Sequence, residues 1–214
     1  MQDAINAIIN DLNEDTVLVA VSKYRTIEEI YEAASCGCKV FGENHVQEIV
    51  NKYDPNYKWH MIGHLQKNKV KALLPFVDMI ESLDSLALAK EIEKEASKIN
   101  KVIPVLVQIN ISHEENKTGI NLEDTLSFID ECILSFPHIK IKGLMCVASN
   151  TDNEKQVKVE FKAMQDMFYQ CKSIYHEDIK YLSMGMSHDY KLALEYGANI
   201  VRIGTAIFGE RTKK

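Results

Sequence analysis

The segment VLVAVSKYRT, residues 17–26, decides the fold that we expect. Its five apolar residues, Val17 to Val21, form a short valine-rich run that is typical of a buried strand in a parallel sheet. Thr26 then opens TIEEI, where Glu29 lies at the capping-box spacing, so a helix is expected directly afterwards. The intervening turn contains no glycine, whereas a doubly wound sheet that holds a dinucleotide usually has a glycine-rich turn there. The segment therefore favours a closed barrel over an open sheet.

The same order of strand and helix repeats along the whole chain. Eight short apolar runs alternate with longer segments of helical period, which indicates parallel strands joined by crossover helices. Eight such units predict the fold class α/β, as one (β/α)₈ TIM barrel that forms a single domain over residues 1–214. The expected strands are 17–22, 39–42, 59–63, 77–82, 102–110, 139–147, 179–184 and 200–204, and the expected helices are 3–12, 26–35, 46–52, 67–74, 85–99, 122–135, 154–175 and 190–196.

Several residues are expected to mark the ends of helices. Asp84 is placed to cap the helix that follows the fourth strand, and Glu43 to cap the helix that begins near Asn44. Gly37 and Gly197 each follow a predicted helix, where a residue in the left-handed conformation is wanted. These signals set the boundaries of the expected elements.

Composition limits the classes of function. The chain has 214 residues, 46% of them hydrophobic, and a net charge of −6 without a basic stripe, which argues against a nucleic-acid surface. The first residues lack the pattern of a secretion signal, and no apolar stretch is long enough to span a membrane, so we expect a cytoplasmic protein. The five cysteines include no CxxC pair, and only Cys36 and Cys38 are close in sequence. We therefore expect reduced thiols and no metal site.

The residues at the carboxyl ends of the expected strands suggest a ligand. Lys23 follows the first strand, which lies beside the eighth strand in a closed barrel. The loops after strands seven and eight contain GMS, residues 185–187, and Gly204-Thr205, which supply the glycines and hydroxyls of a phosphate site. Arg202 adds a second cation, which would lower the pKa of Lys23 and favour a neutral amine that forms a Schiff base with an aldehyde. This set suits a phosphorylated aldehyde such as pyridoxal 5′-phosphate (PLP).

The same segments carry a family resemblance over nearly the whole chain. The motifs VAVSKYR, FGEN, WHMIGHLQKNK, GLM, YLSMGMSHD and VRIGTAIFG stand in this order between residues 19 and 209. Together they resemble the signatures of the pyridoxal phosphate homeostasis proteins, which have the barrel fold of the alanine racemase N-terminal domain. Several motifs in one order make this resemblance specific.

The resemblance implies a PLP-binding barrel with Lys23 as the Schiff-base lysine. It implies that Arg202 approaches the pyridine nitrogen of PLP. In the loop after the fifth strand, Lys117 and Gly119 match a family element, and the match at His113 is looser. The remaining implied cofactor-binding residues are Ser187, Gly204 and Thr205 around the phosphate with Ser183 nearby, Asn44 and His60 on the cofactor side of the pocket, and Met184 near the ring.

Three functions remain open from the sequence. The first is a PLP homeostasis protein that stores or delivers the cofactor and limits its free aldehyde, acting as a monomer with apo-PLP enzymes as transient acceptors. The second is a low-activity PLP-dependent amino-acid racemase, with His60 and Tyr24 as candidate bases. The third is a phosphosugar aldolase or isomerase that uses Lys23 and Glu43 without PLP. An arginine at the pyridine nitrogen weakens the ring as an electron sink, and the racemases have a further domain that supplies the opposing tyrosine. We therefore favour the first function and expect little catalysis.

Overall fold

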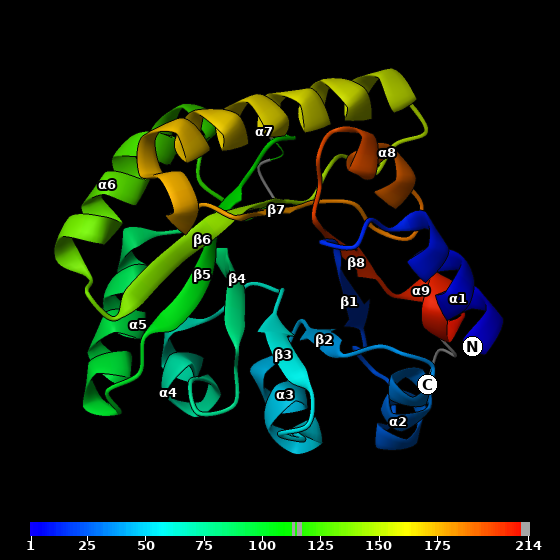
Figure 1. Cartoon of the computed structure of the whole chain (residues 1–214). Coiled ribbons are helices and arrows are strands. Elements are labelled where there is room, and N and C mark those ends of the chain that lie inside the picture. Colours follow the sequence, from blue (N-terminus) through cyan, green and yellow to red (C-terminus); the bar gives the residue numbers. More distant parts are fainter. Residues whose placement is uncertain (113, 115–116, 211–214) are drawn as a thin grey trace.

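The computed structural model describes residues 1–112, 114 and 117–210, and the chain folds into one closed barrel of parallel strands in sequence order. Helices surround the barrel (Figure 1). This confirms the predicted TIM barrel, and all eight expected strands are present within a few residues of their expected ends. The strands are β1 (Val17–Val21), β2 (Val40–Glu43), β3 (Lys58–Met61), β4 (Met79–Leu83), β5 (Ile103–Ile109), β6 (Ile139–Cys146), β7 (Tyr181–Ser183) and β8 (Ile200–Ile203).

The helices lie where the periodicity of the sequence predicts them. Two of the expected helices, those at 67–74 and 122–135, begin with a short 3₁₀ turn before the α-helix proper. The α-helices are α1 (Gln2–Asp11), α2 (Ile27–Ser35), α3 (Val46–Lys52), α4 (Val70–Leu73), α5 (Leu86–Lys98), α6 (Thr125–Ser135), α7 (Glu154–Tyr175), α8 (Tyr190–Glu195) and α9 (Thr205–Phe208), and the 3₁₀ turns are η1 (Lys67–Lys69), η2 (Leu122–Asp124) and η3 (His176–Asp178).

The first and last strands close the barrel. In the β1–β8 pairing, Val19 lies opposite Arg202 and Ala20 opposite Ile203. Successive side chains of a strand point to opposite faces of the sheet, so one set faces the barrel interior and the other faces the helices. A small apolar cluster, separate from the large core beneath the helices, fills the barrel interior towards the amino ends of the strands. Its buried members are Val19, Met79, Leu106, Met145 and Ile200.

Some of the predicted helix ends are confirmed and two are wrong. Thr26 and Glu29 form the expected capping box, and Gly37 has a positive φ of 108° after α2. Asp84 does not cap α5, because the Ser85 hydroxyl accepts the Leu88 N–H while Asp84 accepts from Ser85 and contacts His64. Two adjacent residues of capping type made this end ambiguous by one position.

Glu43 is not a helix cap either. β2 continues through Glu43, and α3 begins only at Val46, with His45 at its N-cap position. The Glu43 carboxylate is completely buried and accepts hydrogen bonds from Ser22 and Lys52. A carboxylate at a strand end and one at a helix start look alike in sequence, and here the longer strand decides between them.

Three further predictions concern the cysteines, membrane-spanning helices and His113. All five cysteines are free thiols, as expected. Among the described residues, no helix has the length and apolar character needed to cross a membrane. His113 lies outside the described residues.

Candidate cofactor-binding site

A polar layer lies in the barrel interior, above the apolar cluster. Met79, Leu106 and Ile200 belong to that cluster and Tyr181 packs against it, and the residue two positions further along each strand faces the same way. These next inward positions are occupied by polar side chains. They are Glu81 on β4, Gln108 on β5, Ser183 on β7 and Arg202 on β8, and all four are buried.

Glu81 is the centre of this layer. One of its carboxylate oxygens lies 2.6 Å from Nδ1 of His60, and the other accepts from the Ser183 hydroxyl at 2.6 Å. Burial opposes ionisation of Glu81, but the bond to His60 and the nearby charge of Arg202 hold the pKa of this carboxyl below its usual value. An ionised carboxylate only accepts, so Nδ1 of His60 is the donor in this pair.

Arg202 is fixed by the same layer. Only 4% of the residue is exposed, and its Nη1 donates to the Ser183 hydroxyl at 2.5 Å and lies 3.9 Å from Glu81. Its Nη2 donates to the main-chain carbonyl of Cys146 at 2.7 Å. A guanidinium has five N–H donors, so two directed bonds orient the group and leave donors for a ligand acceptor. The layer therefore presents an oriented cation inside the barrel.

Lys23 stands directly after β1 and is half-buried. It lies in a turn from Ser22 to Arg25 that the Arg25 N–H closes by donating to the Ser22 carbonyl at 3.0 Å. Tyr24, the next residue, has a positive φ of 63°. The turn lies at the carboxyl end of the barrel, where ligands of this fold bind.

The loops after β7 and β8 meet beside β1. The Ser187 hydroxyl accepts the N–H groups of Gly204 and Ala206, each at 3.3 Å, so the two loops are joined. A Cβ built on Gly204 would lie 3.4 Å from the Val21 side chain, which places this loop against the end of β1. Thr205 is exposed and begins α9. The hydroxyls and main-chain N–H groups at this corner have the chemistry of an anion site.

The structure separates the other predicted site residues. Asn44 follows β2 and packs against Gly63, where an added Cβ would lie 2.5 Å from the Asn44 carbonyl oxygen. Asn44 also lines a cavity of about 660 Å³ between α3 and the loop after β3. Met184 is fully buried in the large outer core, so its side chain is not part of the inward layer. Its backbone, rather than its thioether, is the part that the β7 loop could bring to a ligand.

Sequence reasoning missed three ionic residues, of which Glu81 is buried and the other two are partly buried. Glu81 was read only as the end of a strand, although a charge at an inward position two residues after Met79 requires a partner. Lys52 and Glu48 lie on α3, where charged residues are ordinary, yet Lys52 reaches the turn that carries Lys23. The spacing of inward positions could have identified Glu81, whereas no local pattern identifies the contacts of Lys52.

The sequence of this chain is similar to those of known proteins. The family described as alanine racemase, N-terminal domain, matches residues 1–212. A protein of Aquifex aeolicus named pyridoxal phosphate homeostasis protein is 43% identical over 198 residues, which cover 91% of this chain and 86% of that protein. This chain belongs to the pyridoxal phosphate homeostasis protein family. The family member of the same name from Mus musculus is 37% identical over 210 residues, covering 91% of this chain and 76% of that protein.

Solved structures agree with membership of the pyridoxal phosphate homeostasis family. PipY of Synechococcus elongatus without PLP superimposes with a TM-score of 0.91 at 29% identity, covering 97% of this chain and 99% of that chain. PipY with PLP bound gives a TM-score of 0.88 at 28% identity, with the same coverage. Alanine racemase of Clostridium difficile is 17% identical with a TM-score of 0.77, and this chain covers 56% of it. The racemase likeness shows the fold alone.

Proposed function

We propose that this protein holds PLP as a Schiff base on Lys23 and takes part in PLP homeostasis, storing and delivering the cofactor and limiting its free aldehyde, without robust catalysis. The observation that carries the proposal is the convergence of three features on one barrel mouth. They are the Lys23 turn, the oriented Arg202 in the polar layer and the joined loops at Ser187. The family name and the PLP-bound PipY structure support PLP as the ligand.

The donors of the site match the groups of PLP. The phosphate would lie at the Ser187 corner, where Ser187, Gly204 and Thr205 offer hydroxyl and main-chain donors. Arg202, which lies deeper in the barrel opposite Val19, would approach the pyridine nitrogen. Lys23, beyond the end of β1, would meet the aldehyde. The order of these groups, from the corner to the barrel interior, suits a ring that carries phosphate, aldehyde and nitrogen on different sides.

The covalent step requires only the Lys23 amine. In its neutral form this amine would supply the nucleophile and both protons for a condensation with an aldehyde, which gives a Schiff base and releases water. When bound, PLP supplies this aldehyde and a conjugated ring that acts as an electron sink. Arg202 would hold the ring nitrogen as a hydrogen-bond acceptor, because a guanidinium remains protonated and only donates. This chain therefore binds the ring while restricting its use as a sink.

The candidate bases support a carrier more than an enzyme. His60 is buried and its Nδ1 is bonded to Glu81. Tyr24 is 66% exposed, and its hydroxyl lies 3.4 Å from Nε2 of His45, at the N-cap position of α3. Turnover of an amino acid above the rate of free PLP would overturn the carrier role and favour the racemase alternative.

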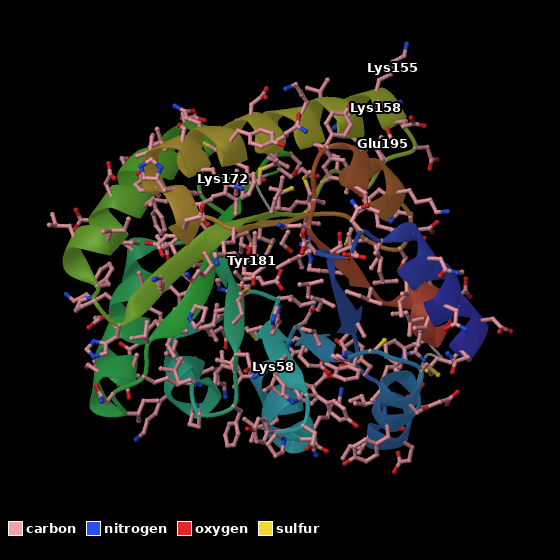
Figure 2. The ribbon with its side chains drawn as sticks, in the orientation of Figure 1. Lys58, Lys155, Lys158, Lys172, Tyr181 and Glu195 are labelled. Carbon is pink, nitrogen blue, oxygen red and sulfur yellow. The ribbon has the colours of Figure 1, made fainter. Side chains whose placement is uncertain are left out.

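An absorbance spectrum with added PLP tests the proposal. The wild type should develop the band of a Schiff base, and borohydride should fix PLP to the peptide that contains Lys23. Lys23→Ala should lose both signals, while Lys172→Ala, at an exposed lysine on α7, should keep them. Lys172 is labelled near the end of α7 in Figure 2. If the wild type shows no band, the site binds another ligand and the phosphosugar alternative becomes the leading function.

The remaining parts of the proposal concern partners and place of action. Apo-PLP enzymes would be transient acceptors of the cofactor, and the protein would act as a monomer in the cytoplasm. Wild-type protein loaded with PLP should activate an apo-PLP enzyme. Under the same conditions, an equal amount of Lys23→Ala mixed with PLP should leave more free PLP aldehyde in solution. Sedimentation should give the mass of one chain with and without PLP.

A further inference from the structure

We propose that Lys52 is a positioning residue for Lys23, which holds the turn on both sides of Lys23 and so sets how fast its amine captures the PLP aldehyde. The inference rests on the proposed function of Lys23. It concerns two residues of α3 and the last residue of β2, which lie beside the turn. We call Lys52, Glu48 and Glu43 the clamp.

Every donor of the Lys52 ammonium is used within this region. Lys52 is the last residue of α3 and its side chain is 10% exposed. Its Nζ donates to the Ser22 carbonyl at 2.9 Å, to Glu43 at 2.9 Å and to Glu48 at 2.7 Å. An ammonium has three N–H groups, so the three acceptors hold this group in one orientation.

The clamp grips the backbone before and after Lys23. The Ser22 carbonyl, on the preceding side, accepts from Lys52. The Tyr24 N–H, on the following side, donates to Oε2 of Glu48 at 2.8 Å, and that oxygen also accepts from Lys52. The hydrogen bonds on the two sides of Lys23 therefore belong to one connected network. Glu43 extends the network, because it accepts from the Ser22 hydroxyl at 2.7 Å.

The turn needs such support because of its third residue. Tyr24 has a φ of 63° at a turn position where glycine or asparagine is usual. A bulky residue with a positive φ persists only where its surroundings hold it there. Two charge-assisted hydrogen bonds, one to the Ser22 carbonyl and one from the Tyr24 N–H, restrain the turn in this conformation. Without them the turn can relax, and the backbone that carries Lys23 loses its fixed conformation.

The experiment compares Lys52→Met with Lys52→Arg and with Lys58→Met as the control. Lys58, labelled in Figure 2, begins β3 at the opposite end of the barrel strands. Its exposed side chain pairs with the partly buried Asp78. Two readouts are taken after circular dichroism confirms folding. The first is hydrogen exchange of the Tyr24 amide without PLP, and the second is the rate at which the Schiff-base band appears after PLP is added.

In Lys52→Met we expect both readouts to change by roughly tenfold or more, the size expected when bonds to a charged group are lost. The Tyr24 amide should exchange faster and the band should form more slowly. Lys52→Arg should lie nearer the wild type, and Lys58→Met should match it. Tyr24→Gly added to Lys52→Met should restore part of the rate, because glycine adopts a positive φ without strain.

Unchanged exchange, or faster exchange with an unchanged rate of band formation, overturns the proposal. The second result would mean that the clamp only stabilises the fold. If Lys52→Met does not fold, Glu48→Ala tests the same grip, because it removes the acceptor of the Tyr24 N–H and leaves Lys52 with Glu43. A wild type without any band refutes the function of Lys23, whereas the exchange readout still reports on the clamp itself.

Discussion

At the scale of the residue, Glu43 carries a carboxyl that burial makes difficult to ionise. Burial outweighs the bonds from Lys52 and Ser22 and raises the pKa of Glu43 from 4.5 to about 7. The folded state therefore retains a proton that the unfolded state loses between pH 4.5 and 7. The stability that depends on this proton is complete below pH 4.5 and is lost as the pH rises through 7.

Glu43→Gln should remove this pH dependence, since glutamine has no proton to lose. Relative to the wild type, the variant should gain on the order of 1–3 kcal/mol in the free energy of unfolding between pH 5 and pH 8. Urea unfolding at the two pH values measures the change. Glu195→Gln, at an exposed carboxylate of α8, is the control and should show no such gain. A difference between Glu43→Gln and wild type that stays constant with pH would contradict the expectation.

Glu81 and Arg202 form a second residue-scale test, because each supplies charge that the other needs inside the barrel. Glu81→Gln should cost about 3 kcal/mol of unfolding free energy, since it leaves the buried guanidinium without its carboxylate. The double variant Glu81→Gln with Arg202→Met should be more stable than Glu81→Gln alone, because the unpaired charge is then gone. Denaturant unfolding of the two variants distinguishes these cases, and additive losses would show that the two charges are independent.

At the scale of the element, Gly143 allows β6 to lie against β7. It has a φ of 153°, and an added Cβ would lie 1.8 Å from the main-chain oxygen of Tyr181. Gly143→Ala should therefore cost about 3 kcal/mol or more in the free energy of unfolding, as overpacking against a backbone that cannot move aside. Gly209→Ala is the matched control, with a positive φ and nothing within 4 Å of its Cβ. Its loss should be smaller, about 1–2 kcal/mol, because alanine adopts a φ of 76° with a ψ of 177° only with strain. Equal losses would show that backbone conformation, not space, dominates.

The elements also show what the sequence could predict. The strands were predictable because most of their residues are buried and apolar, and α2 because Thr26 and Glu29 carry a local signal. The positions of Lys23 and Ser187 followed from the rule that ligands bind at the carboxyl ends of the strands. The roles of Lys52 and Glu81 could not follow in this way, because their partners come from other strands and loops. Such contacts depend on register and on helix placement, which no local pattern specifies.

At the scale of the whole molecule, α1 joins the two ends of the chain. Figure 1 shows it beside α8 and α9. Ile5 of α1 is fully buried, and Asp11 accepts from the Tyr190 hydroxyl at 2.7 Å. Ile5→Ala should cost about 2–4 kcal/mol of unfolding free energy, because it leaves a cavity between these ends. Ile9→Ala, at a residue that is 41% exposed, should cost far less in the same urea titration. Similar losses would mean that the burial of Ile5 is not the way in which α1 stabilises the fold.

The closure of β1 against β8 has a consequence for the order of events during synthesis. A ribosome releases the chain from its first residue, so Lys23 emerges long before Arg202, which pairs opposite Val19. At about 5–20 residues per second, the interval is roughly 10–35 s. During this interval Lys23 lacks both the donors around Ser187 and the Arg202 guanidinium. These groups would select one aldehyde from the many in a cell. If Lys23 holds PLP as proposed, selective loading must wait until Arg202 has been synthesised, and a chain stalled before that residue should emerge without PLP.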